Sequence, residues 1–138
     1  MSNDVELGSP SNVAPDDSYE HAARAGDFIF LAGQIAMDET GAWVGGDAAN
    51  QARQIYINID RILKHMGATR RQVVKVNTIL TDLADRPDVA KIRLEYFGDH
   101  HPPHTGVVVA ALGLPEIRME VEVIAYAPKS CRKKADTE

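Results

Sequence analysis

The residue best suited to catalysis or ligand binding is a histidine in a proline-rich segment. It is His104, in Pro102-Pro103-His104-Thr105-Gly106. A neutral imidazole with an ordinary pKa near ~6.5 suits general acid or base catalysis, and a protonated imidazole can bind a carboxylate. The alternative is a turn histidine whose ring is satisfied by solvent or by a neighbouring backbone group. The residue types alone leave both interpretations open.

Two glutamates near the end of the chain form a second candidate. Glu120 and Glu122 are two residues apart, so they share one face if residues 118–126 form a strand. Such a carboxylate pair superficially resembles the pair used in glycoside hydrolysis. The alternative is a charged strand face turned toward solvent or toward an oligomer interior, with Glu122 paired to Arg118 or Arg53.

Three other polar side chains could take part in a site or only surround it. Tyr19 either places its hydroxyl in a cleft or packs with the hydroxyl at the surface. Arg53 and Lys75 either supply a cation to a cleft or are ordinary charges on a helix surface and a strand edge.

Metal and disulfide chemistry are not expected. His100, His101 and His104 carry imidazoles, which bind zinc readily, but their spacing across two prolines matches no ligand template. The single cysteine, Cys131, lies in a polar tail and cannot close a disulfide within the chain. We interpret it as an exposed thiol without a role.

The 138 residues, 44% hydrophobic and 25% charged, predict one globular domain. We expect a flexible lead-in at residues 1–17, the domain at 18–128 and a polar tail at 129–138. The net charge of −5 argues against nucleic-acid binding, which needs clustered Lys and Arg. The sequence has neither an apolar run of the ~20 residues that a membrane span needs nor a secretory signal, so no membrane association and a cytoplasmic location are expected.

Two helices are predicted from the spacing of apolar residues. Between residues 47 and 66 apolar side chains recur every three or four positions, with Asp47 as N-cap and Gly67 as terminator. The second helix has Asp85 as its expected cap and Pro87 in the first turn, where a missing N–H costs little. Its buried stripe consists of Val89, Ile92, Tyr96 and Phe97.

Five apolar or alternating runs predict strands at about 19–24, 28–32, 73–81, 107–111 and 118–126. The order β-β-α-β-α-β-β is typical of an α+β fold in which two helices cover one face of a single mixed sheet. The other face would expose too much apolar surface for a monomer. We therefore expect a closed homo-oligomer whose sheets meet at that face.

Several short segments occur together in one known group of proteins. They are Gly26 to Ile35 (GDFIFLAGQI), Gln51-Ala52-Arg53-Gln54 leading to Asn58-Ile59, Leu63 to Gly67, Val73-Val74-Lys75-Val76, and Met119 to Ala125 (MEVEVIA). Their order and spacing resemble the Rid family, also called YjgF or L-PSP endoribonuclease-like. The similarity runs from about Tyr19 to Pro128.

The resemblance implies a chorismate-mutase-like fold and a homotrimer with an inward-facing sheet barrel and three clefts at subunit interfaces. It also implies hydrolysis of 2-aminoacrylate-type enamines and imines to 2-keto acids and ammonia. In such members an arginine after Pro-Ala pairs with the substrate carboxylate, and a tyrosine, a last-strand glutamate and backbone groups complete the site. No metal or organic cofactor is implied.

The family pattern transfers to this sequence with departures. Tyr19 matches the tyrosine and Glu120 the glutamate, but His104 stands at the arginine position. Ala32 replaces the usual serine before Gly-Gln, and Ala90 falls where an asparagine is frequent in the second helix. The predicted site therefore has His104, Glu120 and Tyr19 as catalytic residues and Gly33, Gln34, Ala32 and Thr105 as substrate-binding residues.

The histidine changes the expected chemistry, because an arginine holds a carboxylate bidentately and stays charged, whereas an imidazole offers one good contact. A Glu120 carboxylate within hydrogen-bonding reach would favour the charged imidazole. Otherwise a neutral His104 and Glu120 would shuttle a proton during imine hydrolysis or tautomerisation.

Three hypotheses follow. The leading one is a small-molecule enzyme that acts on an imine, an enamine or a related tautomer by acid-base chemistry in an inter-subunit cleft. The alternative is a non-catalytic ligand-binding or regulatory trimer, which the loss of the arginine also motivates. Ribonuclease activity ranks third, because the acidic sequence lacks the basic surface with interspersed aromatic residues that RNA binding favours.

Overall fold

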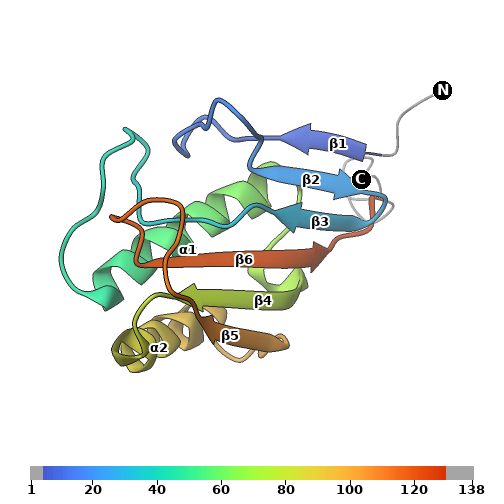
Figure 1. Ribbon diagram of the computed structural model, residues 1–138. Helices are drawn as coiled ribbons and strands as arrows, with labels where there is room; N and C mark the ends of the chain where they lie inside the picture. Colours follow the sequence, from blue (N-terminus) through green and yellow to red (C-terminus); the bar gives the residue numbers. More distant parts are fainter. Residues whose placement is uncertain (1–4, 130–138) are drawn as a thin grey trace.

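The computed structural model of the chain describes residues 5–129, in which it has six strands and two α-helices (Figure 1). The strands are β1 Val5–Gly8, β2 Ala22–Ala25, β3 Phe28–Leu31, β4 Val73–Leu80, β5 His104–Val108 and β6 Met119–Tyr126, and the helices are α1 Ala48–His65 and α2 Arg86–Phe97. Cys131 and the basic tail lie outside the described residues. No helix in residues 5–129 is long and apolar enough to cross a membrane.

The strands form one mixed sheet in the order β1-β2-β3-β6-β4-β5, in which β4 and β5 are parallel. The chain passes from β3 through α1 to β4, and from β4 through α2 to β5, so both crossovers advance in the same direction across the sheet. Since such crossovers are right-handed in nearly all proteins, both helices lie on one face (Figure 1). The predicted α+β architecture is confirmed.

Helix α1 forms much of the core, as its apolar spacing predicts. Ile55, Ile59 and Ile62 are fully buried in one cluster with alternate residues of β4 and β6. The Asp47 side chain accepts a hydrogen bond from the Asn50 backbone N–H (2.8 Å), which caps the helix N-terminus. The predicted extent and capping of this helix are confirmed.

A buried arginine fastens the sheet to the end of α1. Arg24 of β2 is 2% exposed and donates hydrogen bonds to the carbonyl oxygens of Ala127 (2.7 Å), just after β6, and Met66 (2.9 Å), the C-cap of α1. A cation is favourable at a helix C-terminus, where the backbone dipoles place partial negative charge. Arg24 thus joins three elements that are far apart in sequence.

Three details differ from the sequence-based prediction. Strand β1 lies inside the expected lead-in and pairs with β2, so the element order gains a strand at its start. Strand β5 begins at His104, which therefore opens a strand instead of lying in a turn. Asp85 precedes α2, but its carboxylate accepts two hydrogen bonds from Arg118 (2.7 and 2.8 Å) and makes no capping bond.

The sheet face opposite the helices is uncovered in the single chain. Phe28, Phe30 and Tyr126 are 43%, 44% and 44% exposed there, and the ring centroids of Phe28 and Tyr126 are 5.1 Å apart. The edge strand β5 is exposed along its whole length. An apolar face beside a free strand edge is typical of a surface that associates with another chain.

Candidate functional site

Glu120 of β6 and Gly33, which follows β3, are in direct contact. A Cβ atom built on Gly33 would lie 3.1 Å from Glu120 Cδ, so a larger residue would displace the carboxyl group. The Tyr19 hydroxyl lies within electrostatic range: burial, Asp16 and Glu120 together raise the pKa of Tyr19. The structure therefore places Glu120 against Gly33 and within electrostatic range of the Tyr19 hydroxyl.

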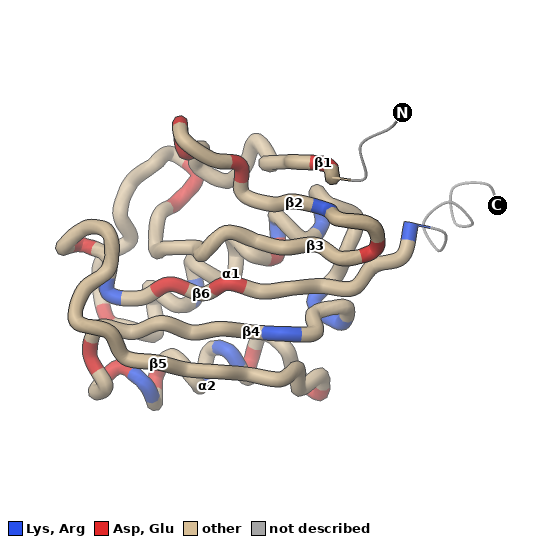
Figure 2. Tube along the Cα trace, turned by 45° about the vertical axis from the view of Figure 1, so that its right-hand side comes forward, with Lys and Arg blue, Asp and Glu red and all other residues tan. Residues whose placement is uncertain are grey.

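The environment of Glu120 alters its acidity. Burial, followed by the adjacent Glu122 carboxylate, raises the pKa of Glu120 above its ordinary range. Figure 2 shows the acidic residues of β6 near the middle of the sheet. A carboxyl group with a raised pKa is well suited to take up and return a proton near neutral pH.

Glu122 is not paired as its sequence context suggested. Its side chain accepts a hydrogen bond from Asn77 Nδ2 (3.0 Å), because Asn77 of β4 lies directly opposite it in the sheet. The Arg118 guanidinium is bound to Asp85 instead. The predicted pairing of Glu122 with Arg118 or Arg53 is therefore wrong.

The strand end at residues 32–34 leaves one set of backbone groups available. Ala32 N–H donates to the His21 carbonyl, and Gln34 exchanges two backbone hydrogen bonds with Val121. The Gln34 side chain is also committed, since its amide donates to His21 Nδ1 (3.1 Å) and to the Ala32 carbonyl (3.3 Å). Among the described residues, only Gly33 in this stretch keeps its N–H and C=O unengaged.

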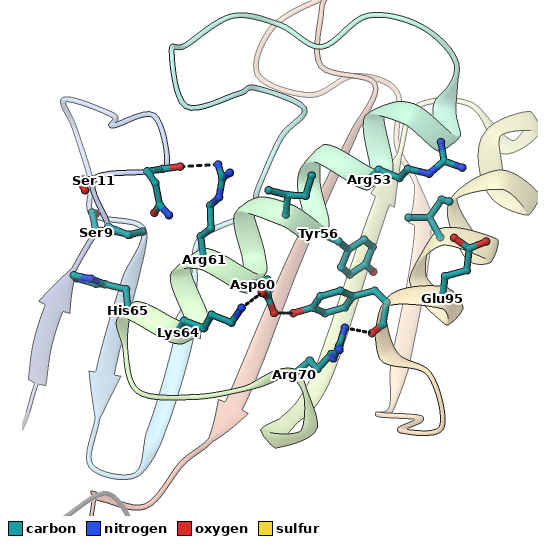
Figure 3. A pocket seen from close by; sticks show the side chains of 15 residues that line it. Ser9, Ser11, Arg53, Tyr56, Asp60, Arg61, Lys64, His65, Arg70 and Glu95 are labelled. Atoms are coloured by element: carbon teal, nitrogen blue, oxygen red, sulfur yellow. Dashed lines mark hydrogen bonds and ion pairs between the residues drawn. The ribbon is translucent and has the colours of Figure 1, made fainter. Parts of the chain in front are cut away.

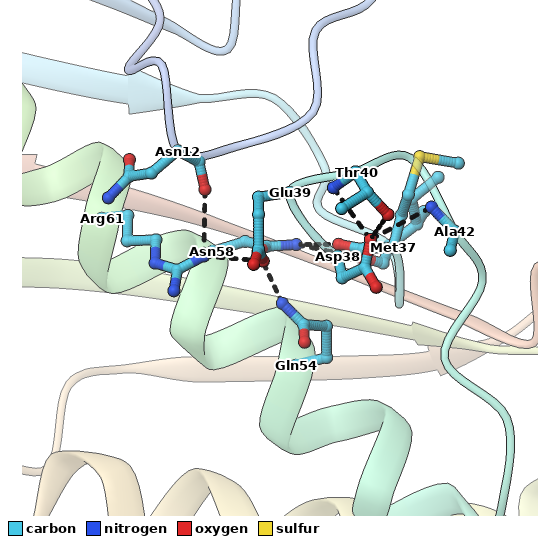
Figure 4. Close-up of polar contacts among 10 residues, drawn as sticks. Asn12, Met37, Asp38, Glu39, Thr40, Ala42, Gln54, Asn58 and Arg61 are labelled. Atoms are coloured by element: carbon cyan, nitrogen blue, oxygen red, sulfur yellow. Dashed lines mark hydrogen bonds and ion pairs between the residues drawn. The ribbon is translucent and has the colours of Figure 1, made fainter.

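The loop after Gln34 is anchored to α1, which fixes the strand end. Asn58 of α1 is buried and donates its side-chain amide to the carbonyls of Met37 (2.9 Å) and Ile35 (3.3 Å) (Figure 4). Asp38 Oδ1 accepts backbone hydrogen bonds from Thr40 and Ala42, which close the following turn. Gly33 is thus presented by a rigid segment.

His104 occupies the helix-covered face of the sheet. Its Nε2 lies 2.9 Å from Oγ1 of Thr78, a buried residue of β4. The next residue, Thr105, points to the opposite face, where its hydroxyl accepts a hydrogen bond from Lys75 Nζ (2.7 Å). This alternation follows from strand geometry, in which successive side chains point to opposite faces.

A cleft of about 290 Å³ separates His104 from α2, and Arg86, Ala90 and Arg93 line its helical side. Partial burial of the imidazole against the cleft, followed by the positive charges of Arg93, Lys75 and Arg86, lowers the pKa of His104 to about 4. The imidazole is consequently neutral at pH 7. The predicted possibility of a charged His104 is thus disfavoured by its surroundings.

His104 and Glu120 lie on opposite faces of the sheet. Thr78, which contacts His104, faces the helices, whereas Glu120 shares the open face with Glu122 and Asn77. Within one chain the expected proton shuttle between His104 and Glu120 is therefore not assembled. The chain carries two half-sites: an open-face half with Tyr19, Gly33 and Glu120, and a helix-face half with His104.

Comparison with known proteins identifies the family of the chain that carries these half-sites. A family model described as Endoribonuclease L-PSP matches residues 10–127. A RutC family protein of Pyrococcus abyssi is 40% identical over 119 residues, which cover 86% of this chain and 91% of the relative. The chain belongs to the Rid family. Another relative, the human 2-iminobutanoate/2-iminopropanoate deaminase, is 34% identical over 118 residues, covering 85% of this chain and 83% of its own length.

Solved structures of Rid proteins share the fold over nearly the whole domain. The Rid-family protein YyfA from Yersinia pestis has a TM-score of 0.85 at 28% identity, covering 89% of this chain and 99% of its own. RidA from the Antarctic bacterium Psychrobacter has a TM-score of 0.82, also at 28% identity, covering 88% and 98%.

A larger hollow of this Rid chain, about 1210 Å³, lies on the outer face of α1, away from both half-sites (Figure 3). Several of its polar groups already bind one another. Asp60 accepts hydrogen bonds from Tyr96 Oη (2.8 Å) and Lys64 (2.8 Å), and Arg70 donates to the Tyr96 carbonyl (3.0 Å). A groove whose charges are mutually satisfied offers fewer groups to a ligand, so we place the Rid site elsewhere.

The sequence did not point to two residues next to His104. Thr78 was predicted only as part of a strand, although its position next to Asn77 puts it on the buried side. Arg93 follows Ala90 by three positions and therefore shares its helix face. That spacing is the one sequence feature that could have placed Arg93 in the cleft.

Proposed function

We propose that this Rid chain hydrolyses 2-imino acids to 2-oxo acids and ammonia, in sites formed between copies of the chain in a homotrimer. The observation that carries the proposal is the contact between Glu120 and Gly33, which holds a carboxyl group of raised pKa beside unengaged backbone groups. Relatives named 2-iminobutanoate/2-iminopropanoate deaminase, from human and from the mite Dermatophagoides farinae, support this substrate class.

In the proposed reaction Glu120 moves the protons. The oxygen of a water molecule bonds to the imine carbon while Glu120 accepts a proton from that water and returns it to the imine nitrogen. The hydroxyl of the resulting carbinolamine then loses its proton to the nitrogen as the C–N bond breaks. The products are a 2-oxo acid and ammonia, so atoms and charge balance without a cofactor.

A second copy of the chain is needed to complete the site. The open-face half carries Glu120 and Tyr19, and the helix-face half carries His104, and the sheet separates them within one chain. A neighbouring copy that packs against the open face and the edge of β5 would join one half from each chain. The exposed aromatic rings of Phe28, Phe30 and Tyr126 supply apolar surface for that contact.

The substrate contacts follow from the groups left available. Gly33 would offer its backbone N–H or C=O, and Thr105, whose hydroxyl oxygen already accepts from Lys75, would offer its O–H as a donor. Gln34 and Ala32 would act by shaping the strand end, because their hydrogen bonds are committed within the chain. A cytoplasmic location and the absence of a metal remain predictions of the sequence.

The test is hydrolysis of 2-iminobutanoate generated in situ by an amino-acid oxidase, with ammonia and 2-oxobutanoate release measured against the spontaneous rate. We expect the wild-type chain to accelerate hydrolysis and Glu120→Gln to lose about 10²–10⁴-fold in rate. Glu95→Gln, an exposed glutamate of α2, is the matched control and should keep full activity.

Other outcomes distinguish the alternatives. Thermal stabilisation by small carboxylates without turnover would favour the non-catalytic binding trimer. Cleavage of RNA by the purified trimer, abolished by Glu120→Gln, would favour the ribonuclease hypothesis. A monomer in light scattering at micromolar concentration would contradict shared sites.

A further inference from the structure

The cleft beside His104 is lined by cations from one stripe of α2. Arg86, Ala90 and Arg93 are spaced by four and three residues, so they share a helix face. Arg93 also lines an adjoining hollow of about 110 Å³, to which His104, His101 and other residues contribute. The Arg93 side chain therefore stands where the two hollows meet at His104.

The Arg93 guanidinium has no hydrogen bond or ion pair within residues 5–129. Arg24, Arg71 and Arg118 are engaged, Arg71 with Asp99 and Arg118 with Asp85, both at 2.7 Å, and Arg24 with backbone carbonyls. Arg53 and Arg86 also lack such a partner within residues 5–129, but Arg53 lines neither hollow beside His104 and Arg86 is exposed. An unpaired, half-buried guanidinium facing a cleft binds an anion more strongly than one in bulk water, because the local dielectric is lower.

We propose that Arg93 binds the carboxylate of a 2-imino or 2-oxo acid in the cleft beside His104. The inference rests on the proposed function and names the group that recognises its substrate. A guanidinium can donate two parallel hydrogen bonds to a carboxylate, which a neutral imidazole cannot. Arg93 would then bind the charged carboxylate of the substrate, and Glu120 would transfer the protons at the reacting carbon and nitrogen.

Two other cations fit this role less well. Arg86 is exposed at the start of α2 and lines only one of the two hollows. Lys75 points to the opposite face of the sheet, where its ammonium donates to Thr105. Arg93 also has the largest effect among the charges that lower the pKa of His104, in keeping with its position beside the ring.

The experiment measures binding of 2-oxobutanoate and of its uncharged methyl ester by isothermal titration calorimetry to the intact protein. Arg93→Gln is expected to weaken 2-oxobutanoate binding by about 10–100-fold, the usual effect of losing a hydrogen-bonded charge partner. Binding of the ester should change less than about twofold. The control Lys91→Gln removes the same charge from an exposed position of α2 that lines neither hollow, and it should leave both affinities unchanged.

A double variant makes the test specific. Arg93→Gln/His104→Arg should regain most of the lost affinity, because it restores a guanidinium to the same cleft. The inference is overturned if the wild-type chain binds no 2-oxobutanoate, if Arg93→Gln binds it as tightly as wild type, or if acid and ester weaken together. If the protein binds the carboxylate through Arg93 but does not hydrolyse imines, only the proposed function is contradicted. If Arg93→Gln hydrolyses imines as fast as the wild-type chain, only the role of Arg93 is contradicted.

Discussion

The Glu120 carboxyl group fills the space beside the Cα atom of Gly33 that any side chain at position 33 would occupy. The requirement is spatial and not conformational, because Gly33 is absent from the glycines with positive φ in the described chain. Glycine at position 33 therefore determines where the carboxyl group of position 120 can lie.

Gly33→Ala tests this relationship. The added methyl group should displace the carboxyl group by several tenths of an ångström or more and lower kcat/KM by about 10–100-fold, since misplacement of a catalytic group by about 1 Å can cost 10² in rate. Gly113→Ala is the control, because a Cβ at Gly113 meets nothing within 4 Å. Unchanged imine hydrolysis by Gly33→Ala would remove the Glu120 position from the mechanism.

His104 should titrate far below an ordinary histidine, at a pKa of about 4. Because this value lies below that of the unfolded chain, only the unfolded state gains a proton between pH 6.5 and 4, so the free energy of unfolding attributable to His104 decreases as pH falls through that window. NMR titration of the imidazole measures the pKa directly. Arg93→Gln should raise it and Lys91→Gln should not; a titration near ~6.5 in the wild-type chain would show that the ring is not in this environment.

Two impaired variants should complement each other. In sites shared between copies, Glu120→Gln removes the proton-transfer group of the open-face half and Arg93→Gln removes the proposed carboxylate ligand of the helix-face half, so a mixed trimer contains some clefts with both halves intact. Co-expression of differently tagged variants, followed by purification through both tags, should yield trimers with one active cleft in three. Each such trimer holds two copies of one variant and one of the other, and only one of its clefts takes an intact half from each. Each variant alone is the control. A mixed trimer as inactive as its parents would show that no cleft combines the two halves.

Arg24→Met should destabilise the fold by about 2–4 kcal/mol, because the carbonyls of Met66 and Ala127 lose their donors while buried. Urea unfolding at fixed protein concentration measures the change. Arg71→Met is the matched control: Arg71 pairs with Asp99 at the surface, where both side chains are mostly exposed, and a change below about 1 kcal/mol is expected. Equal losses in the two variants would contradict the clamping role of Arg24.

The sequence was informative where periodicity or capping is strong. Helix α1 could be predicted because its apolar residues repeat at helical spacing over 18 residues and Asp47 precedes them. Strand β1 could not, because four mostly exposed residues at a sheet edge bury too little apolar surface to leave a pattern. Its pairing with β2 is a tertiary event that local residue types do not encode.

The sequence predicted one half-site better than the other, because the second depends on tertiary structure. Tyr19, Gly33 and Glu120 could be grouped through the family resemblance. The separation of His104 from Glu120 depends on where β5 begins and on its register with β4, and a shift of one residue reverses every side-chain direction. The role proposed for Arg93 depends on the cleft between α2 and β5, which exists only in the folded chain.

The position of β6 bears on how the chain is made. Of the six strands in residues 5–129 it is synthesised last, yet it lies in the middle of the sheet between β3 and β4. Until residues 119–126 have been synthesised, no strand joins β1-β2-β3 to β4-β5 by hydrogen bonds. Arg24 also lacks the carbonyl of Ala127 at that stage. Folding must therefore finish after synthesis of the domain is complete, and during translation the apolar edges of both pieces remain exposed to other nascent chains.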